Sequence, residues 1–156
     1  MGYYILFLPL AASIISGFFG KLIGDKASQL VTSLFVSISA FLSIIVLYNV
    51  IATGYSENLI IATWINSGSL NVNWSVNIDP LSAVMLVVVT LVSAIVHIYS
   101  IGYMSHDPHK SRFMSYLSLF TFAMLTLVTS DNFIQLFFGW EGVGLCCCLL
   151  YTSDAA

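Results

Sequence analysis

The chain has 156 residues, of which 59% are hydrophobic and only 7% are charged, and its formal net charge is −3. Water-soluble domains carry about 25% charged residues, so this composition excludes an ordinary soluble domain. So little polar sequence lies between the apolar stretches that no nucleotide-binding fold and no nucleic-acid-binding surface is expected.

Five apolar stretches are each long enough to cross a membrane, at residues 3–20, 28–53, 80–103, 113–129 and 132–150. About 20 apolar residues in a helix span a hydrocarbon core of about 30 Å. The third stretch begins with Asp79-Pro80, an acid at the N-cap followed by proline at the first helical position. The sequence therefore predicts an all-α polytopic membrane protein with about five transmembrane helices.

Residues 54–79, between the second and third stretches, have a different pattern. From Leu70 to Ile78, apolar residues alternate strictly with polar ones, which is typical of a strand with one wet face. An apolar run, 60–65, precedes it, and residues 66–69 supply turn material. We predict a β-hairpin on the membrane surface, with Trp64 and Trp74 at the interface. A structural cap is favoured over a docking surface for a neighbouring protein.

All the basic residues lie in two of the predicted loops. Lys21 and Lys26 follow the first stretch, and Lys110 and Arg112 follow the third. The positive-inside rule places both loops in the cytoplasm or matrix, with the N-terminus and the hairpin on the periplasmic or intermembrane side. The first stretch has no basic residue before it, so it is interpreted as a retained span rather than a signal peptide.

Glu141 is the only charged residue inside a predicted span. If the fifth helix starts near Asn132, Glu141 lies about 14 Å along it, close to the membrane midplane. A charge there costs at least about 2.5 kcal/mol on insertion scales, so such residues usually belong to ion or proton pathways. The alternative is a protonated glutamic acid that joins two helices. On the helical wheel, Gln135, Gly139 and Cys146 lie towards the opposite side.

His97 belongs to a polar stripe on the third helix. The members of the stripe fall within about 80° of one another on the helical wheel, and they are Ser82, Thr90, Ser93, His97 and Ser100. A polar stripe must face protein or water rather than lipid. His97 is either a proton relay or a buried neutral histidine bonded to a hydroxyl group. No Lys or Arg of this chain is expected to reach Glu141, which leaves His97 as its titratable candidate partner.

The remaining metal-ligand residue types do not predict a metal site. Cys146, Cys147 and Cys148 are consecutive, so their side chains point about 100° apart on a helix, and packing is their expected role. His106 and His109 lie in a polar loop that has few carboxylates. No metal and no cofactor bound by this chain are predicted.

Four segments together resemble a known family. They are Asp79–Ser82, Val96–Met104, Arg112-Phe113 and Phe138–Cys146. This set is similar to the N-terminal part of subunit L of bacterial respiratory complex I, the equivalent of chain 5 of mitochondrial NADH dehydrogenase, over about residues 1–150. The resemblance implies a proton-translocating membrane-arm subunit of NADH:quinone oxidoreductase. Its partners would be protons, lipid and the other membrane subunits, in the bacterial inner or mitochondrial inner membrane.

The resemblance also carries expectations for individual residues. The family's glutamate matching Glu141 pairs with a lysine on a later helix, and the histidine matching His97 lies near the proton route. NADH, FMN, iron–sulfur clusters and quinone are implied for the parent complex only. Family members are much longer, so a truncated fragment is expected. The sequence departs from the family pattern after Cys146, and residues 151–156 are interpreted as a foreign tail.

Two other functions remain open at this point. A subunit of a multi-subunit cation/proton antiporter or of a membrane hydrogenase shares much of the same motif set, and neighbouring genes would distinguish these from complex I. A third hypothesis makes the chain a structural element that transports nothing.

Overall fold

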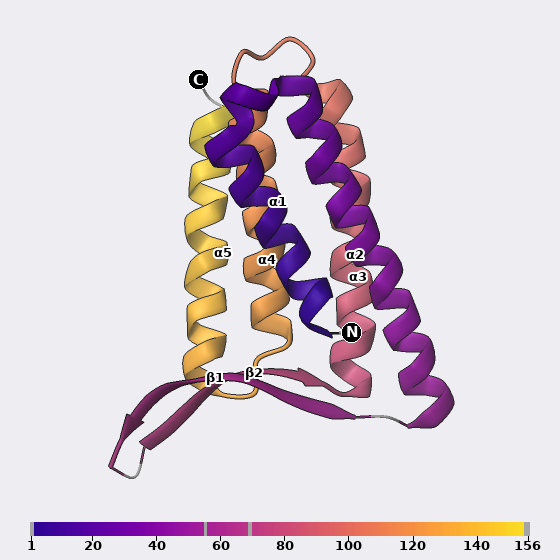
Figure 1. Ribbon diagram of the computed structural model, residues 1–156, viewed down its shortest axis with the longest axis vertical. Helices are drawn as coiled ribbons and strands as arrows, with labels where there is room; N and C mark the ends of the chain where they lie inside the picture. Colours follow the sequence, from indigo (N-terminus) through magenta and orange to yellow (C-terminus); the bar gives the residue numbers. More distant parts are fainter. Residues whose placement is uncertain (1, 55, 69, 155–156) are drawn as a thin grey trace.

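The computed structural model describes residues 2–54, 56–68 and 70–154. Five helices stand side by side within these ranges (Figure 1). They are α1 (Gly2–Ile23), α2 (Asp25–Thr53), α3 (Pro80–Tyr103), α4 (Lys110–Val128) and α5 (Phe133–Asp154). Each is long and apolar enough to cross a membrane. Strands β1 (Glu57–Ser67) and β2 (Leu70–Ile78) form an antiparallel hairpin between α2 and α3, so the predicted fold class is confirmed.

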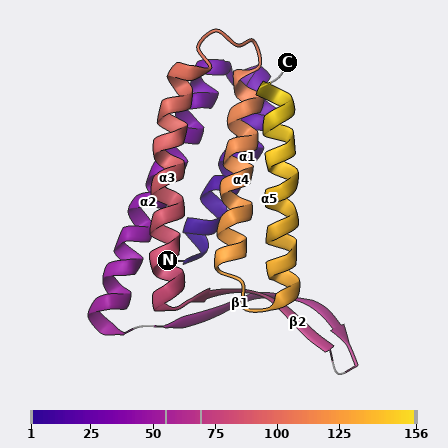
Figure 2. The same cartoon turned by 180° about the vertical axis from the view of Figure 1, so that it is seen from behind.

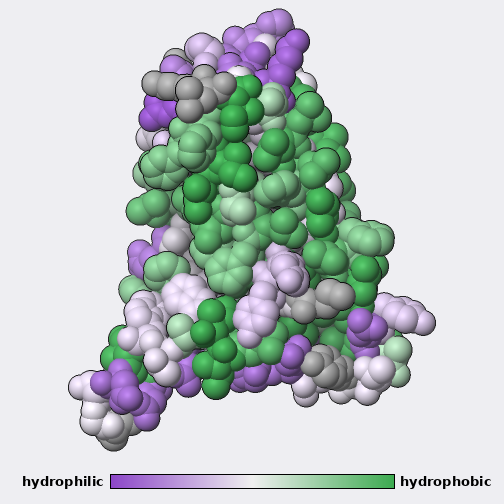
Figure 3. Space-filling view, in the orientation of Figure 1, coloured by the Kyte–Doolittle hydropathy of each residue, from purple (hydrophilic) through white to green (hydrophobic). Residues whose placement is uncertain are grey.

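The hairpin lies across one end of the helix bundle, and the α1–α2 and α3–α4 connections lie at the other end (Figure 1). Seen from either side, α4 stands between α3 and α5, and it contacts both (Figure 2). A broad apolar surface separates the two polar ends on the face shown in Figure 3. Exposed side chains such as Leu34, Val92 and Ile98 contribute to the apolar exterior that a lipid-facing bundle requires.

The helices extend beyond the apolar stretches at several ends. α1 reaches Ile23 and α2 begins at Asp25, so the predicted loop shrinks to Gly24, whose φ of 89° favours glycine. α4 begins at Lys110, three residues early, and α5 continues to Asp154. Hydropathy marks the part of a helix that lies in lipid, whereas the helix itself continues where water can satisfy its backbone. Ser69 of the predicted turn and residues 155–156 of the predicted tail lie outside the described residues.

The alternation in β2 predicts its buried face correctly. Val72, Val76 and Ile78 are at most 5% exposed. The opposite face is not wet along its whole length as predicted: Asn71 is exposed, but Ser75 is buried. The main core cluster forms where this face meets four helices, and its members are Ile5, Leu6, Val46, Val50, Val76, Ile78, Ala83, Leu86 and Leu125. The hairpin is therefore packed into the end of the bundle rather than attached to it by its loops alone.

Asp79 caps α3 as the sequence predicts. Its carboxylate accepts a hydrogen bond of 2.7 Å from the backbone N–H of Ser82 and another from the Ser82 hydroxyl. These hydrogen bonds hold the pKa of Asp79 below its ordinary value of 3.8.

Replacing Asp79 with alanine is expected to lower the stability of the protein by about 1 kcal/mol, the usual cost of losing an N-cap. Because the folded pKa is lowered, the contribution of the carboxylate is complete above its ordinary pKa of 3.8 and is lost as the pH falls through the folded pKa. Thermal unfolding in detergent, followed over the acid range, measures this loss. Asp79→Asn is the control, since an amide does not titrate; an acid-induced loss of equal size in that variant would contradict the assignment.

Candidate functional site

Glu141 lies near the middle of α5. The helix begins after Asn132, whose side-chain oxygen accepts a 2.8 Å hydrogen bond from the backbone N–H of Gln135. Glu141 follows Phe133 by eight residues, which places it about 12 Å along the helix axis. Glu141 therefore lies near the middle of α5, as the sequence predicts.

The opposite side of α5 packs tightly on α4. A Cβ atom added to Gly139 would lie 2.8 Å from the Cα atom of Leu127, so only glycine allows this approach. One turn further, a Cβ atom on Gly142 would lie 3.2 Å from the Cβ atom of Ala123. Cys146 is 2% exposed on the same side, whereas Cys147 and Cys148 are exposed. The predicted packing role therefore applies to Cys146.

The side chain of Glu141 is exposed and lines an open groove between α4 and α5. The groove has a volume of about 620 Å³, and its walls are otherwise apolar. They include Leu119, Phe122 and Ala123 from α4 and Phe138, Gly142, Gly144 and Leu145 from α5. Among the described residues, none donates a hydrogen bond to the Glu141 carboxylate. In a helix that crosses a membrane, an acid near the middle requires either a proton or a cationic partner.

His97 is fully buried between α3 and α4. Its Nδ1 lies 2.7 Å from the backbone oxygen of Ser93, and its Nε2 lies 3.0 Å from the hydroxyl of Ser118. A carbonyl oxygen can only accept, so Nδ1 carries the proton, and the Nε2 of the neutral ring accepts from Ser118. The structure thus supplies the hydroxyl partner that the neutral-histidine interpretation requires.

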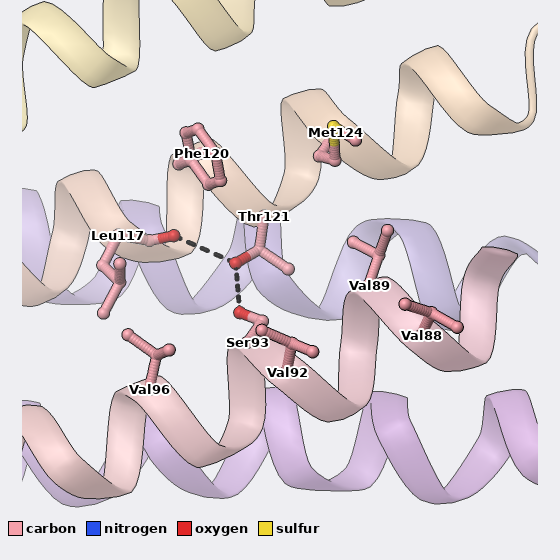
Figure 4. A pocket seen from close by; sticks show the side chains of 9 residues that line it. All are labelled: Val88, Val89, Val92, Ser93, Val96, Leu117, Phe120, Thr121 and Met124. Atoms are coloured by element: carbon pink, nitrogen blue, oxygen red, sulfur yellow. Dashed lines mark hydrogen bonds between the residues drawn. The ribbon is translucent and has the colours of Figure 1, made fainter.

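The polar stripe of α3 faces neighbouring helices. Thr90 pairs with Ser43 of α2 at 2.8 Å, and Ser93 pairs with Thr121 of α4 at 2.5 Å. Thr121 in turn donates to the backbone oxygen of Leu117. Figure 4 shows the hydrogen bonds from Ser93 to Thr121 and from Thr121 to Leu117 among the side chains of a cavity of about 270 Å³, whose other lining residues are all apolar. The polar stripe of α3 therefore makes its hydrogen bonds to the helices packed against it, α2 and α4.

The structure does not bring His97 and Glu141 together. His97 contacts α4 from the α3 side, whereas Glu141 lines the groove that α4 shares with α5. Because α4 stands between the two helices (Figures 1 and 2), the candidate partnership expected from the sequence is not formed within the described residues.

One set of contacts near the site was not predicted from the sequence. Gln135, which is fully buried, bonds through its side-chain amide to both the backbone N–H and the backbone oxygen of Ser75 in β2. The sequence places Gln135 opposite Glu141 on α5 but contains no sign of this partner, since the two residues are 60 positions apart. The only available signal is a polar side chain on the glycine-lined face of a membrane helix.

Comparison with known proteins connects this geometry to a family. Residues 64–114 match a family described as complex I (NADH-ubiquinone oxidoreductase), chain 5 N-terminus. NADH-ubiquinone oxidoreductase chain 5 of Phytophthora infestans is 53% identical over 146 residues, which cover 94% of this chain and 22% of the relative. The protein of the same name from Arabidopsis thaliana gives the same identity and coverage.

Bacterial relatives are similar to the same extent. NADH-quinone oxidoreductase subunit L of Rickettsia conorii is 51% identical over 159 aligned positions, covering 97% of this chain and 24% of the relative. The chain thus spans about a quarter or less of the length of the curated relatives it matches. Along nearly its whole length, with about 50% identity, the chain is therefore similar to NADH-ubiquinone oxidoreductase chain 5 and NADH-quinone oxidoreductase subunit L.

Proposed function

We propose that this chain forms the N-terminal part of a proton-translocating membrane-arm subunit of NADH:quinone oxidoreductase. The observation that carries the proposal is the position of Glu141, an acid near the middle of a membrane-spanning helix that faces an open groove. Burial favours the neutral form of a carboxyl group, and a nearby cation favours its charged form. An acid held between these influences can take up a proton and release it when the surrounding charges change.

The groove is the place where a partner for Glu141 would enter. The described residues on its walls include no base, and the groove is open. We propose that a later helix of the longer subunit brings a lysine into the groove, as the family resemblance implies. The other membrane subunits of the complex and the surrounding lipid are its further partners.

We assign His97 as a secondary relay group. Its Nε2 can take up a proton on the Ser118 side. The proton on Nδ1 can then pass to the Ser93 hydroxyl, whose oxygen lies 3.3 Å from Nδ1. Ser93 and Thr121 continue the chain of exchangeable protons along the seam between α3 and α4. Because α4 separates His97 from Glu141, His97 would deliver protons to the path that contains Glu141 rather than exchange a proton with Glu141 directly.

We infer the orientation of the subunit from its charges. Lys26, Lys110 and Arg112 belong to the end of the bundle opposite the hairpin (Figure 1). The positive-inside rule then places that end in the cytoplasm or matrix and the hairpin in the periplasm or intermembrane space. The membrane is the bacterial inner or mitochondrial inner membrane.

The redox chemistry belongs to other subunits under this proposal. The described residues contain no group of three or more His, Cys, Asp or Glu side chains that could hold a metal ion. We assign NADH, FMN, the iron–sulfur clusters and quinone to the parent complex, as the family resemblance implies. This chain contributes the proton path alone.

The direct test is deletion of the gene in the organism that carries it, followed by complementation with the intact gene. The proposal expects fewer protons translocated per NADH oxidised by membrane vesicles, and full recovery on complementation. Unchanged NADH-driven proton translocation would overturn it. A loss of sodium/proton exchange without any change in NADH-driven proton movement would instead favour the antiporter function.

A further inference from the structure

The outer edge of β2 is covered by the segment that leads into α5. The backbone oxygen of Asn73 accepts from the side chain of Asn132 at 2.8 Å, and the backbone N–H of Asn77 donates to the oxygen of Thr129 at 2.9 Å. Ser75, between them, pairs with Gln135. Alternate residues of the strand edge are therefore bonded as if a third strand were present.

Gln135 contributes the most directional of these contacts. Its Oε1 accepts from the backbone N–H of Ser75 at 3.1 Å, and its Nε2 donates to the backbone oxygen of Ser75 at 2.7 Å. The side chain is completely buried. A buried amide with both ends satisfied tolerates little rotation, because turning it away would leave two buried backbone groups without a hydrogen-bond partner.

The glycine contacts of α5 do not fix the helix in the same way. Gly139 and Gly142 allow α5 to approach α4 closely, but a glycine surface has no side chain that interlocks with its neighbour. The hydrogen bonds of Gln135 supply what the glycine contacts lack. They define the rotation of α5 about its axis and its position along that axis. Glu141, on the other side of the same helix, takes its direction from that rotation.

Phe138 connects the hairpin to the groove in a second way. Its ring packs edge-on against Trp74, with 5.1 Å between ring centroids, and against Trp64 at 5.8 Å. Phe138 also lines the groove beside Glu141. The wall next to the acid is thus held by two residues of the hairpin.

We propose that Gln135 is a positioning residue for Glu141, which it orients into the groove by anchoring α5 to the backbone of Ser75. This inference rests on the proposed function, because it assigns Gln135 a role in proton transfer that passes through Glu141. Gln135 itself neither takes up nor releases the transferred proton.

The test compares Gln135→Leu with Ser75→Ala in the full-length subunit within the assembled complex. Leucine keeps the size and burial of the side chain but cannot bond to Ser75. Ser75→Ala leaves the backbone N–H and oxygen in place and removes only a hydroxyl that has no hydrogen-bond partner among the described residues. The first readout is protons translocated per NADH oxidised, and the second is the pH at which an apolar carbodiimide labels half of Glu141.

Gln135→Leu is expected to lower the number of protons per NADH by about tenfold, because small misplacements of a reacting group have large effects on rate. It is also expected to move the labelling midpoint by about one pH unit, while the amount of assembled complex and the rate of NADH oxidation are retained. Ser75→Ala should match the unmodified protein in both readouts. If Gln135 had only a structural role, Gln135→Leu would change the amount of assembled complex but not the labelling midpoint of Glu141.

Two further variants make the outcome decisive. In Gln135→Glu, a protonated carboxyl group can reproduce both hydrogen bonds to Ser75, so translocation relative to the unmodified protein should recover as the pH is lowered. Glu141→Gln in the same vesicles distinguishes a failure of the proposed function from a failure of the positioning role. If Glu141→Gln pumps normally, the proposed function fails. If it does not pump but Gln135→Leu behaves like Ser75→Ala, the positioning role alone is overturned.

Discussion

Replacing Glu141 with glutamine is expected to abolish most proton translocation while the subunit still enters the membrane and assembles. Glutamine has nearly the same shape, and Glu141 lies exposed in the groove without a hydrogen-bond partner among the described residues, so little packing is lost. What disappears is the only carboxyl group near the middle of the described part of α5. A positioned acid or base contributes about 10²–10⁴-fold to proton-transfer rates, so translocation per NADH should fall by about tenfold or more.

The measurement is proton uptake or release by vesicles during NADH oxidation, normalised to assembled complex. Glu57→Gln is a matched control, because Glu57 is an acid in the hairpin, outside the membrane-spanning helices. His97→Ala should reduce translocation less than Glu141→Gln, since a water molecule can replace a relay group. Normal translocation by Glu141→Gln would show that the proton site is elsewhere. If His97→Ala lowers the amount of assembled complex but the complex that does assemble translocates protons normally, the role of His97 is structural.

Gly139→Leu is expected to prevent α5 from packing against α4. A Cβ atom at this position would lie 2.8 Å from the N, Cα and Cβ atoms of Leu127, and a helix backbone cannot move aside as a flexible side chain can. Overpacking usually costs about 1–3 kcal/mol, and a clash with backbone belongs at the upper end of this range or above. The amount of assembled subunit in the membrane and its resistance to heat in detergent should both fall.

Gly144→Leu provides the control for this substitution. It places the same side chain in the same helix, but a Cβ atom at Gly144 meets nothing within 4 Å. Gly142→Ala should have an intermediate effect, because its added Cβ atom would lie 3.2 Å from that of Ala123. Equal assembly of the Gly139 and Gly144 variants would mean that α5 does not pack on α4 through its glycines.

Local patterns in the sequence predict most of the fold. The apolar stretches identify all five described helices, and the strict alternation from Leu70 to Ile78 identifies β2 and its buried face. Asp79-Pro80 predicts the start of α3 to the residue, because capping chemistry is local. The ends at Ile23 and Asp154 were missed, since hydropathy reports where lipid ends and not where the backbone stops being helical.

The candidate site is only partly predictable for the same reason. The place of Glu141 near the middle of α5 follows from the apolar stretch, and the opposed position of Gly139 follows from the helical wheel. The groove walls contributed by Leu119 and Phe122, and the pairing of Gln135 with Ser75, depend on which helices become neighbours. Such contacts between distant parts of the chain leave no periodic signal in the sequence.

The covered edge of β2 has a consequence for the order in which the protein is built. The chain emerges from the ribosome N-terminus first, so Ser75 is available 60 residues before Gln135 is synthesised. Until then the strand presents unpaired backbone groups, which are a template for pairing with other chains. The arrival of α5 therefore does two things at once: it closes a surface prone to aggregation and fixes its own register against β2.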